Sequence, residues 1–406
     1  MKKVYIIGLG IGNISYMHKK SEEAVNSSEC LIGAGRMLKS FMDSGKTIYE
    51  SSNAENICEY IDQSRFNSYG IMVSGDSGFY SLSKKITEII ARKNEIIIEN
   101  IPAISSLQYF TAKLNISWDN INYLSAHGRS INVVSHVIFN EKTFILTGRD
   151  FGPGAICELL TNKGLGHLKV SVGENLSYEN ERIIESEVEK IAGMKFESLS
   201  VMLIHNNEFI SKDEGLRSIR DEEFITGSAP MTKSEVRSLS VGKLNLKSNY
   251  TVYDIGAGTG SVSVEAALKL HGGTVYAVEK NSQAAELIYK NIQKFKTRNI
   301  EVVKGSAPLA IENLPKPDAC FIGGSSGNME QIIKIVLAKN PDVDIVVNTI
   351  TLQSLNEALS CMEKYKIKNM EIINVSVSKS KKVGKYDMMI GQNPIYIISG
   401  KGSGIL

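Results

Sequence analysis

Short apolar runs alternate with longer segments in which apolar residues recur every three or four positions, along nearly the whole chain. The short runs are typical of buried β-strands, and the longer periodic segments are typical of amphipathic helices. Their alternation predicts an α/β fold. Strands are expected at residues 4–7, 30–32, 70–74, 95–101, 121–125, 143–147, 169–172 and 199–205, and then at 251–255, 274–279, 300–304, 318–322, 344–349, 371–377 and 395–399.

A polar, charge-rich segment without apolar periodicity, residues 208–223, separates the two series of strands and helices. Such a segment is typical of a linker. A chain of 406 residues is long enough for two domains. We therefore expect one α/β domain over residues 1–207 and a second over residues 224–406.

Charge and cysteine content argue against a nucleic-acid-binding protein, a metalloprotein and a disulfide-stapled protein. The formal net charge is +2 without a long lysine or arginine block, and the five cysteines never form a C-x-x-C pair. No apolar run reaches the roughly 18 residues of a membrane-spanning helix, and the apolar start of the chain is too short for a signal peptide. The sequence predicts a cytoplasmic protein with no bound metal, no nucleic-acid partner and no membrane partner.

The most informative motif is Asp254-Ile-Gly256-Ala-Gly258-Thr-Gly260, between an expected strand and an expected helix. Glycines at such a turn let the backbone approach a ligand, and the helix N-terminus offers free amide groups. The spacing differs from the dinucleotide-binding G-x-G-x-x-G and suits a small ligand that carries a cation and a carboxylate. Glu279, at the end of the next strand, is placed to accept hydrogen bonds from both ribose hydroxyls. A turn that merely closes a tight strand-helix corner is the alternative.

These residues resemble the class I S-adenosylmethionine-dependent methyltransferases. Pro230-Met-Thr232 before the first strand and Lys385-Tyr-Asp near the end narrow the resemblance to the decarboxylating C15 methyltransferases of corrin biosynthesis. The resemblance implies a Rossmann-like domain, S-adenosylmethionine as cofactor, and cofactor contacts by Thr232, Ser306 and Ala307. The family usually has aspartate where this chain has Ser306, so a weaker hydrogen-bond acceptor is expected to face the adenine here.

The first half carries a different set of turns after expected strands. They are Gly8-Leu-Gly10, Gly75-Asp76-Ser77 and, before an expected helix, Ser105-Ser106. In this order they resemble the tetrapyrrole methylase family, in particular its C5-methylating branch, which has two α/β subdomains. The resemblance implies that Gly8 and Gly10 face the tetrapyrrole, and that the other five residues hold S-adenosylmethionine. A turn-capping role for Asp76 and a helix cap at Ser105-Ser106 are the alternatives.

A tetrapyrrole substrate carries several carboxylates, so its sites need cations. The candidates are His127, Arg129, Lys233, Arg237, Lys379 and Lys385. For His127, Arg129 and the lysines near the C-terminus, a solvent-exposed loop is the alternative.

A tetrapyrrole methylase followed by a C15-type methyltransferase implies methylation of a corrin precursor at C5 and at C15, with loss of the ring C acetate as carbon dioxide. Methyl transfer from a sulfonium depends largely on the alignment of donor and acceptor, so no catalytic residue is assigned. Both related domain types commonly assemble, which predicts a homo-oligomer. A substrate with or without cobalt, either order of methylation, and passage of the intermediate between sites all fit the sequence.

Two other functions fit parts of the sequence. One is methylation of RNA or a small metabolite by the class I domain, with an accessory tetrapyrrole-methylase-like domain. The chain lacks an Asn-Pro-Pro-Tyr motif and a basic face, which argues against this reaction. The other is a non-catalytic cofactor-binding protein, and the ligand motifs in both halves argue against it.

Overall fold

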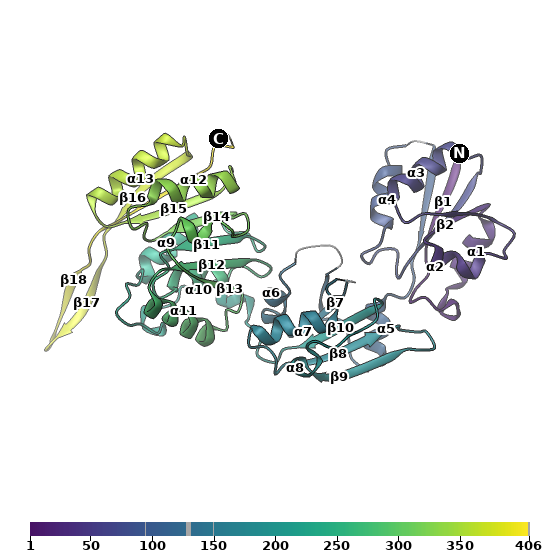
Figure 1. Ribbon diagram of the computed structural model, residues 1–406, viewed down its shortest axis with the longest axis horizontal. Helices are drawn as coiled ribbons and strands as arrows, with labels where there is room; N and C mark the ends of the chain where they lie inside the picture. The colour runs from purple at the N-terminus through teal and green to yellow at the C-terminus, as the bar shows by residue number, and fades with distance from the viewer. Residues whose placement is uncertain (94, 127–130, 149, 405–406) are drawn as a thin grey trace. The chain divides into compact units, whose positions relative to one another are not determined.

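The computed structural model describes residues 1–93, 95–126, 131–148 and 150–404, which form two compact units (Figure 1). The first unit comprises Met1–Ser130 and Lys142–His205, and the second comprises Ile131–Glu141 and Asn206–Leu406. Both units are α/β, as the alternating patterns predict. Within the described residues, no helix is long and apolar enough to cross a membrane.

The first unit begins with a five-stranded parallel sheet. Its elements are β1 (Lys2–Gly8), η1 (Ile14–Tyr16), α1 (Lys19–Ser27), β2 (Cys30–Gly33), α2 (Gly35–Leu38), η2 (Lys39–Phe41), β3 (Thr47–Glu50), α3 (Ala54–Gln63), β4 (Ser68–Val73), α4 (Ser83–Ile90) and β5 (Ile96–Ile101). The strand order is β3-β2-β4-β1-β5. Ile6 packs among residues of α3 and α4, and its neighbour Ile7 packs with residues of α1 on the other face. Burial on both faces explains why these strands appear as continuous apolar runs.

A second sheet completes the first unit and mixes parallel and antiparallel strands. Its elements are α5 (Ser106–Lys113), β6 (Asn122–Ser125), β7 (Lys142–Leu146), α7 (Pro153–Asn162), β8 (Lys169–Glu174), β9 (Arg182–Glu187), α8 (Val188–Ile191) and β10 (Ser200–His205). The strand order is β6-β7-β10-β8-β9, and only β6 and β7 pair in parallel. The sequence patterns miss β3 and β9 because these edge strands are only partly buried and lack an apolar run.

The second unit is built on a seven-stranded sheet. Its elements are α6 (Val133–Ile138), η3 (Lys212–Gly215), η4 (Asp221–Glu223), α9 (Ser234–Lys243), β11 (Thr251–Ile255), α10 (Ser261–Ala267), β12 (Thr274–Glu279), α11 (Ser282–Phe295), β13 (Ile300–Lys304), η5 (Leu309–Ile311), β14 (Ala319–Ile322), α12 (Met329–Lys339), β15 (Asp344–Thr349), α13 (Leu352–Lys364), β16 (Lys368–Val375), β17 (Ser378–Val383), β18 (Tyr386–Gly391) and β19 (Ile395–Lys401). The order is β13-β12-β11-β14-β15-β19-β16, and only β19 runs antiparallel to both its neighbours. Strands β17 and β18 form a separate hairpin that extends away from this sheet in Figure 1.

Helix α6 belongs to the second unit although its sequence lies within the first predicted domain. Ser135 Oγ donates to the Leu270 carbonyl at 2.7 Å, and Asn132 Nδ2 donates to the Gly273 carbonyl at 2.8 Å. Val137 of the same helix is fully buried. The compact units therefore do not follow a single cut at residue 207, and the division of chemistry at that point stays a prediction.

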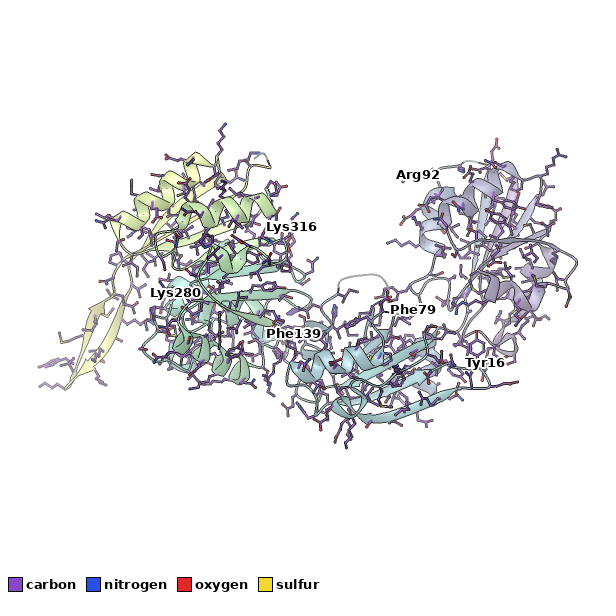
Figure 2. All side chains as sticks on the ribbon, in the orientation of Figure 1. Tyr16, Phe79, Arg92, Phe139, Lys280 and Lys316 are labelled. Atoms are coloured by element: carbon purple, nitrogen blue, oxygen red, sulfur yellow. The ribbon has the colours of Figure 1, made fainter. Side chains whose placement is uncertain are left out.

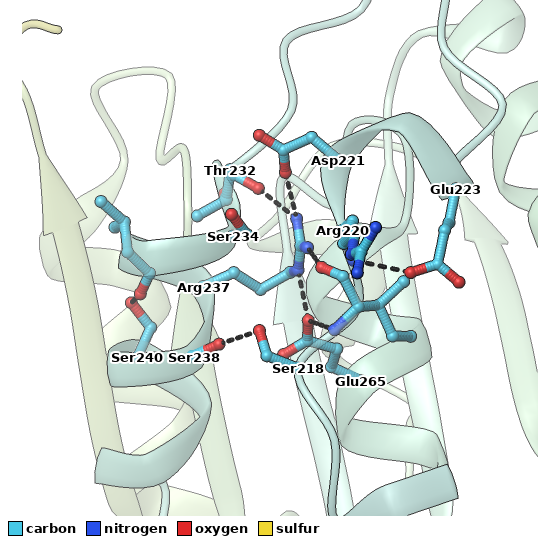
Figure 3. A network of polar contacts seen from close by, with 12 residues as sticks. Ser218, Arg220, Asp221, Glu223, Thr232, Ser234, Arg237, Ser238, Ser240 and Glu265 are labelled. Carbon is cyan, nitrogen blue, oxygen red and sulfur yellow. Dashed lines mark hydrogen bonds and ion pairs between the residues drawn. The ribbon is translucent and has the colours of Figure 1, made fainter. Parts of the chain in front are cut away.

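The segment predicted to be a linker packs onto the second unit through Arg237 of α9, which is fully buried (Figure 3). Arg237 Nε donates to Glu265 at 2.7 Å, and Nη1 donates to Asp221 at 3.2 Å. Nη1 also donates to the Thr232 carbonyl at 2.6 Å, and Nη2 donates to the Ile219 carbonyl. These bonds fasten Ile219 and Asp221 of the predicted linker to the second unit. They also bury the guanidinium of Arg237, which was predicted to meet a substrate, among partners within the chain.

Replacing Arg237 with methionine is expected to lower the free energy of unfolding of the second unit by about 3–5 kcal/mol. The reason is that it leaves the carboxylate of Glu265 buried without its cation. Urea denaturation followed by circular dichroism measures this change. Arg217→Met is the matched control, because Arg217 pairs with Glu214 and Glu223 at the surface and such pairs contribute less than about 1 kcal/mol. Equal destabilisation by the two variants would contradict the role of Arg237.

Candidate active sites

The second unit contains a cleft of about 320 Å³ where loops that follow β11, β12, β13 and β14 meet. Carboxyl ends of parallel strands share one edge of a sheet, which is the usual ligand site in such folds. Five of the predicted cofactor residues line this second-unit cleft: Gly256, Gly258, Glu279, Ser306 and Ala307.

Gly258 brings the backbone of the glycine-rich turn against the segment that precedes α9. Its φ of 56° lies in the left-handed region, and a Cβ here would lie 2.5 Å from the Pro230 carbonyl oxygen. Pro230, with Ser228 and Ala229, also lines the cleft. None of the three was predicted to bind a ligand, although Pro230 belongs to the motif Pro230-Met-Thr232 that carries the resemblance, because the backbone contact that brings them there has no sequence pattern of its own. The glycine-rich turn therefore packs closely against the segment before α9, and both line the cleft.

The carboxylate of Glu279 is fixed by two backbone amides. Oε2 accepts from the Gly258 amide and Oε1 accepts from the Asn281 amide, both at 2.8 Å. A carboxylate has about four lone-pair sites, so each oxygen keeps one for a further donor. The side chain is 9% exposed and lines the second-unit cleft. It is thus a rigid, paired acceptor for a ligand with two adjacent hydroxyls.

Asp254 lies below the cleft rather than in its lining. The side chain is 1% exposed, Oδ2 accepts from the Ser263 hydroxyl of α10, and Oδ1 has no hydrogen-bond partner. Burial, with a smaller contribution from the nearby charge of Glu279, raises the pKa of Asp254 to about 7, although the hydrogen bonds from Ser263 oppose this rise. An unpaired buried carboxylate oxygen fits a neighbouring cationic ligand, because ionisation is then compensated.

Other predicted residues lie outside the lining of the second-unit cleft. Gly260 caps the start of α10, and Thr232 offers its carbonyl to Arg237. Lys379 forms an ion pair with Glu235 at 2.8 Å. The remaining two substrate candidates, Lys233 and Lys385, are exposed outside the cleft, at the start of α9 and in the hairpin turn. None of these residues is brought to the cleft, and a substrate contact by the three lysines stays a prediction.

One cation that the sequence analysis passed over does line the second-unit cleft. Lys280, labelled in Figure 2, follows Glu279 and donates from Nζ to the Ser326 hydroxyl at 2.8 Å. The sequence could have indicated Lys280, because it directly follows Glu279, a predicted cofactor-binding residue at the end of a strand. Among the described residues, no three His, Cys, Asp or Glu side chains are grouped closely enough to hold a metal ion.

The first unit contains a pocket of about 360 Å³, lined by the loops that follow β1 and β4, by the segment around α2 and by residues of the second sheet. Of the predicted residues, Gly10, Gly75 and Ser106 line this first-unit pocket. Gly10 and Gly75 exchange two backbone hydrogen bonds, with the Gly10 amide 3.1 Å and the Gly75 amide 2.9 Å from the partner carbonyl. The loop expected to face substrate is therefore bonded directly to the turn expected to hold the cofactor.

The other predicted residues of the first unit that the structure describes do not line the pocket, and two of them form hydrogen bonds that hold the adjacent turn and helix in place. Asp76 accepts from the Gly78 amide at 2.8 Å and from the Ala103 amide at 2.9 Å. Ser105 forms a capping box with Gln108 at the start of α5. Both alternatives considered for these residues, a turn cap and a helix cap, are thus present. Gly8 and Ser77 lie outside the pocket lining, and His127 and Arg129 lie outside the described residues.

A set of contacts fastens the first loop to the segment before β9, and the sequence analysis missed it. Asn13 Nδ2 donates to the Ser177 carbonyl at 3.1 Å, and the Ser177 hydroxyl donates to the Ile11 carbonyl at 3.0 Å. A Cβ on Gly12, whose φ is 105°, would lie 2.2 Å from the Tyr178 hydroxyl. The residues are more than 160 positions apart in the chain, so only the fold brings them together.

Two family models match the sequence of the chain. The tetrapyrrole (corrin/porphyrin) methylases match residues 3–192, and the precorrin methyltransferase domain matches residues 223–400. A probable cobalt-precorrin-6B C(15)-methyltransferase (decarboxylating) of Sulfurisphaera tokodaii is 39% identical over 193 residues, which are 46% of this chain and 98% of that protein. The chain belongs to the precorrin methyltransferase family.

A longer relative in the precorrin methyltransferase family spans both halves. A precorrin-6Y C(5,15)-methyltransferase [decarboxylating] of Sinorhizobium sp is 26% identical over 354 residues, covering 85% of this chain and 84% of that protein. A solved structure of precorrin-6Y C5,15-methyltransferase from Geobacter metallireducens is 39% identical, with a TM-score of 0.44, and covers 46% of this chain and 96% of that chain. Family membership makes this chain a methyltransferase.

Replacing Gly258 with alanine is expected to lower the stability of the second unit by about 1–3 kcal/mol. The backbone at this position is left-handed, a conformation that a residue with a Cβ disfavours, and the added Cβ would meet the Pro230 carbonyl. Gly242→Ala is the matched control, because Gly242 lies within α9 and a Cβ there meets no atom within 4 Å. That control should gain about 0.5–1 kcal/mol from helix propensity. Thermal unfolding of both variants measures the difference, and a neutral Gly258→Ala would contradict the close contact.

Proposed function

We propose that this chain is a bifunctional S-adenosylmethionine-dependent methyltransferase that acts on a corrin precursor in cobalamin biosynthesis. The first unit methylates C5. The second methylates C15 with loss of the ring C acetate as carbon dioxide. The observation that carries the proposal is the presence of a separate pocket, lined by predicted ligand residues, in each unit of a chain aligned over 85% of its length with a C(5,15)-methyltransferase.

The residues of the second-unit cleft fit S-adenosylmethionine. The free lone pairs of Glu279 accept the two ribose hydroxyls, and Gly256 and Gly258 let the ligand lie against the backbone. The unpaired Oδ1 of Asp254 favours a ligand with a cationic group above it. Ser306 lines the cleft where the family usually has aspartate, so its hydroxyl is the side-chain group offered to the adenine.

In methyl transfer these residues need only align the methyl donor with the acceptor carbon, and none of them has to act as a nucleophile. Bound S-adenosylmethionine supplies a methyl group already activated on a sulfonium. The carboxylate of Glu279 and the turn at Gly258 orient the ligand. Glu279 is held by the Gly258 amide, and the turn packs against the Pro230 carbonyl, so neither moves freely. In the first unit, the two backbone hydrogen bonds between Gly10 and Gly75 hold two loops of the pocket in a fixed position.

The five cysteines are buried free thiols, which supports a reducing compartment such as the cytoplasm. This location is part of the proposal.

The reaction is tested by the mass of the product after incubation with S-adenosylmethionine and the corrin precursor, with and without cobalt. The native chain is expected to add two methyl groups and remove one carbon dioxide. In Glu279→Gln the loss of carbon dioxide should fall by about 10-fold or more, because the amide keeps only one acceptor oxygen. Glu286→Gln, on the exposed face of α11, is the matched control and should match the native chain. Undiminished decarboxylation by Glu279→Gln contradicts the assignment of this step to the second unit.

We also propose that the chain forms a homo-oligomer through the hairpin β17–β18. Every residue of both strands is exposed, including Met388, Met389 and Ile390. An isolated two-stranded hairpin is marginally stable in water, and a cluster of exposed apolar side chains is typical of an interaction surface. A second copy presents the same surface, so a symmetric contact buries both.

Light scattering after size-exclusion chromatography tests this contact. Met389→Lys is expected to shift the protein to a smaller species, because it places a charge within the apolar contact. Leu216→Lys is the matched control, since Leu216 is an exposed apolar residue of the same unit outside the hairpin. A monomeric native protein, or an unchanged mass for Met389→Lys, contradicts the proposal.

A further inference from the structure

The first-unit pocket has one charged side chain in its lining, as far as the described residues show. Arg36 is that residue, and no aspartate or glutamate accompanies it. The rest of the lining is apolar or hydroxyl-bearing, with Leu9, Phe79 and Leu146 among the apolar side chains and Ser40 among the hydroxyls. Such a lining accepts a largely apolar ligand with a negative group at one side.

The guanidinium of Arg36 has few partners within the chain. It donates one long hydrogen bond, from Nη2 to the Ser74 hydroxyl at 3.4 Å. Among the ion pairs of the described residues, none involves Arg36. An arginine carries five donors in a planar fork that matches a carboxylate, so most of its capacity is left for a ligand.

The backbone holds Arg36 in place although its side chain is exposed. It lies in α2, and the amide of the preceding Gly35 donates to Glu50 Oε1 at 3.1 Å. Met37 and Phe41 from the same segment line the pocket and pack into the apolar core beneath it. The Glu50 carboxylate thus anchors the segment by a backbone bond, while Arg36 extends toward the pocket.

We infer that Arg36 binds a carboxylate of the tetrapyrrole and so sets the orientation of the macrocycle for methylation in the first unit. The inference rests on the proposed function. The tetrapyrrole fits this contact better than the cofactor does, because the macrocycle carries several carboxylates, whereas S-adenosylmethionine carries one carboxylate together with two cationic groups that a nearby guanidinium repels. Ser74 precedes Gly75, a predicted cofactor residue, so the test measures both ligands.

The experiment uses the full chain with Glu279→Gln, in which methyl gain reports on the first unit. Arg36→Gln is expected to raise KM for the corrin precursor by about 10- to 100-fold, the effect of losing a charge-assisted hydrogen-bond pair. KM for S-adenosylmethionine and kcat should change less than about threefold, because on this inference the guanidinium contacts a carboxylate of the tetrapyrrole and not the methyl donor. Arg36→Lys should restore part of the loss, since it keeps the charge but not the fork.

Lys39→Gln is the matched control, because Lys39 is an exposed cation three positions along that does not line the pocket. It should leave every constant unchanged. A KM for the precursor that is unchanged in Arg36→Gln overturns the inference, and so does a rise confined to KM for S-adenosylmethionine.

Titration of the precursor's absorbance by the same proteins separates this inference from the proposed function. If the chain with native Arg36 binds the precursor without methylating it, the proposed reaction fails, and the affinity of Arg36→Gln still decides the role of Arg36. If the reaction proceeds and Arg36→Gln binds as tightly as the native chain, the inference fails alone. Absence of any precursor binding overturns both.

Discussion

The carboxyl ends of parallel strands lie at one edge of a sheet, so the loops that follow the strands meet there, and the second-unit cleft depends on this constraint. The turn after β11 meets the turn after β12 there, so the Gly258 amide reaches the carboxylate of Glu279. In the first unit, β1 and β4 pair in parallel, and the loops after them join through Gly10 and Gly75. Each site is therefore a consequence of strand pairing that the apolar cores enforce.

The parts of the structure that sequence predicts well are those with a local cause. Buried parallel strands require continuous apolar runs, and the turn at Gly256 and Gly258 requires residues that adopt positive φ. Both signals are present in the residues themselves. Glu279 was also predictable, because its position follows from the length of one strand-helix-strand unit. These local signals sufficed to place the second-unit cleft.

The parts that sequence misses depend on residues that are distant along the chain. Arg237 is buried because Asp221 and Glu265 converge on it, 16 and 28 residues away. A signal did exist, since α9 buries Val236, Arg237, Ser240 and Val241 on one helical face. The exchange of α6 into the second unit and the contact of Asn13 with Ser177 have no such local signal. Arg36 is similar, because its importance comes from its being the one charged residue among the described residues of the pocket lining, which only the fold defines.

In both units backbone contacts, rather than reactive side chains, fix the loops around the pocket, as the proposed transfer from an already activated methyl donor requires. The central claim is that each unit holds its own donor. Equilibrium dialysis of the full chain with labelled S-adenosylmethionine tests this most directly. The account predicts that two molecules bind per chain at saturation. Saturation at one molecule per chain would contradict it, because one of the two sites would then serve some other ligand.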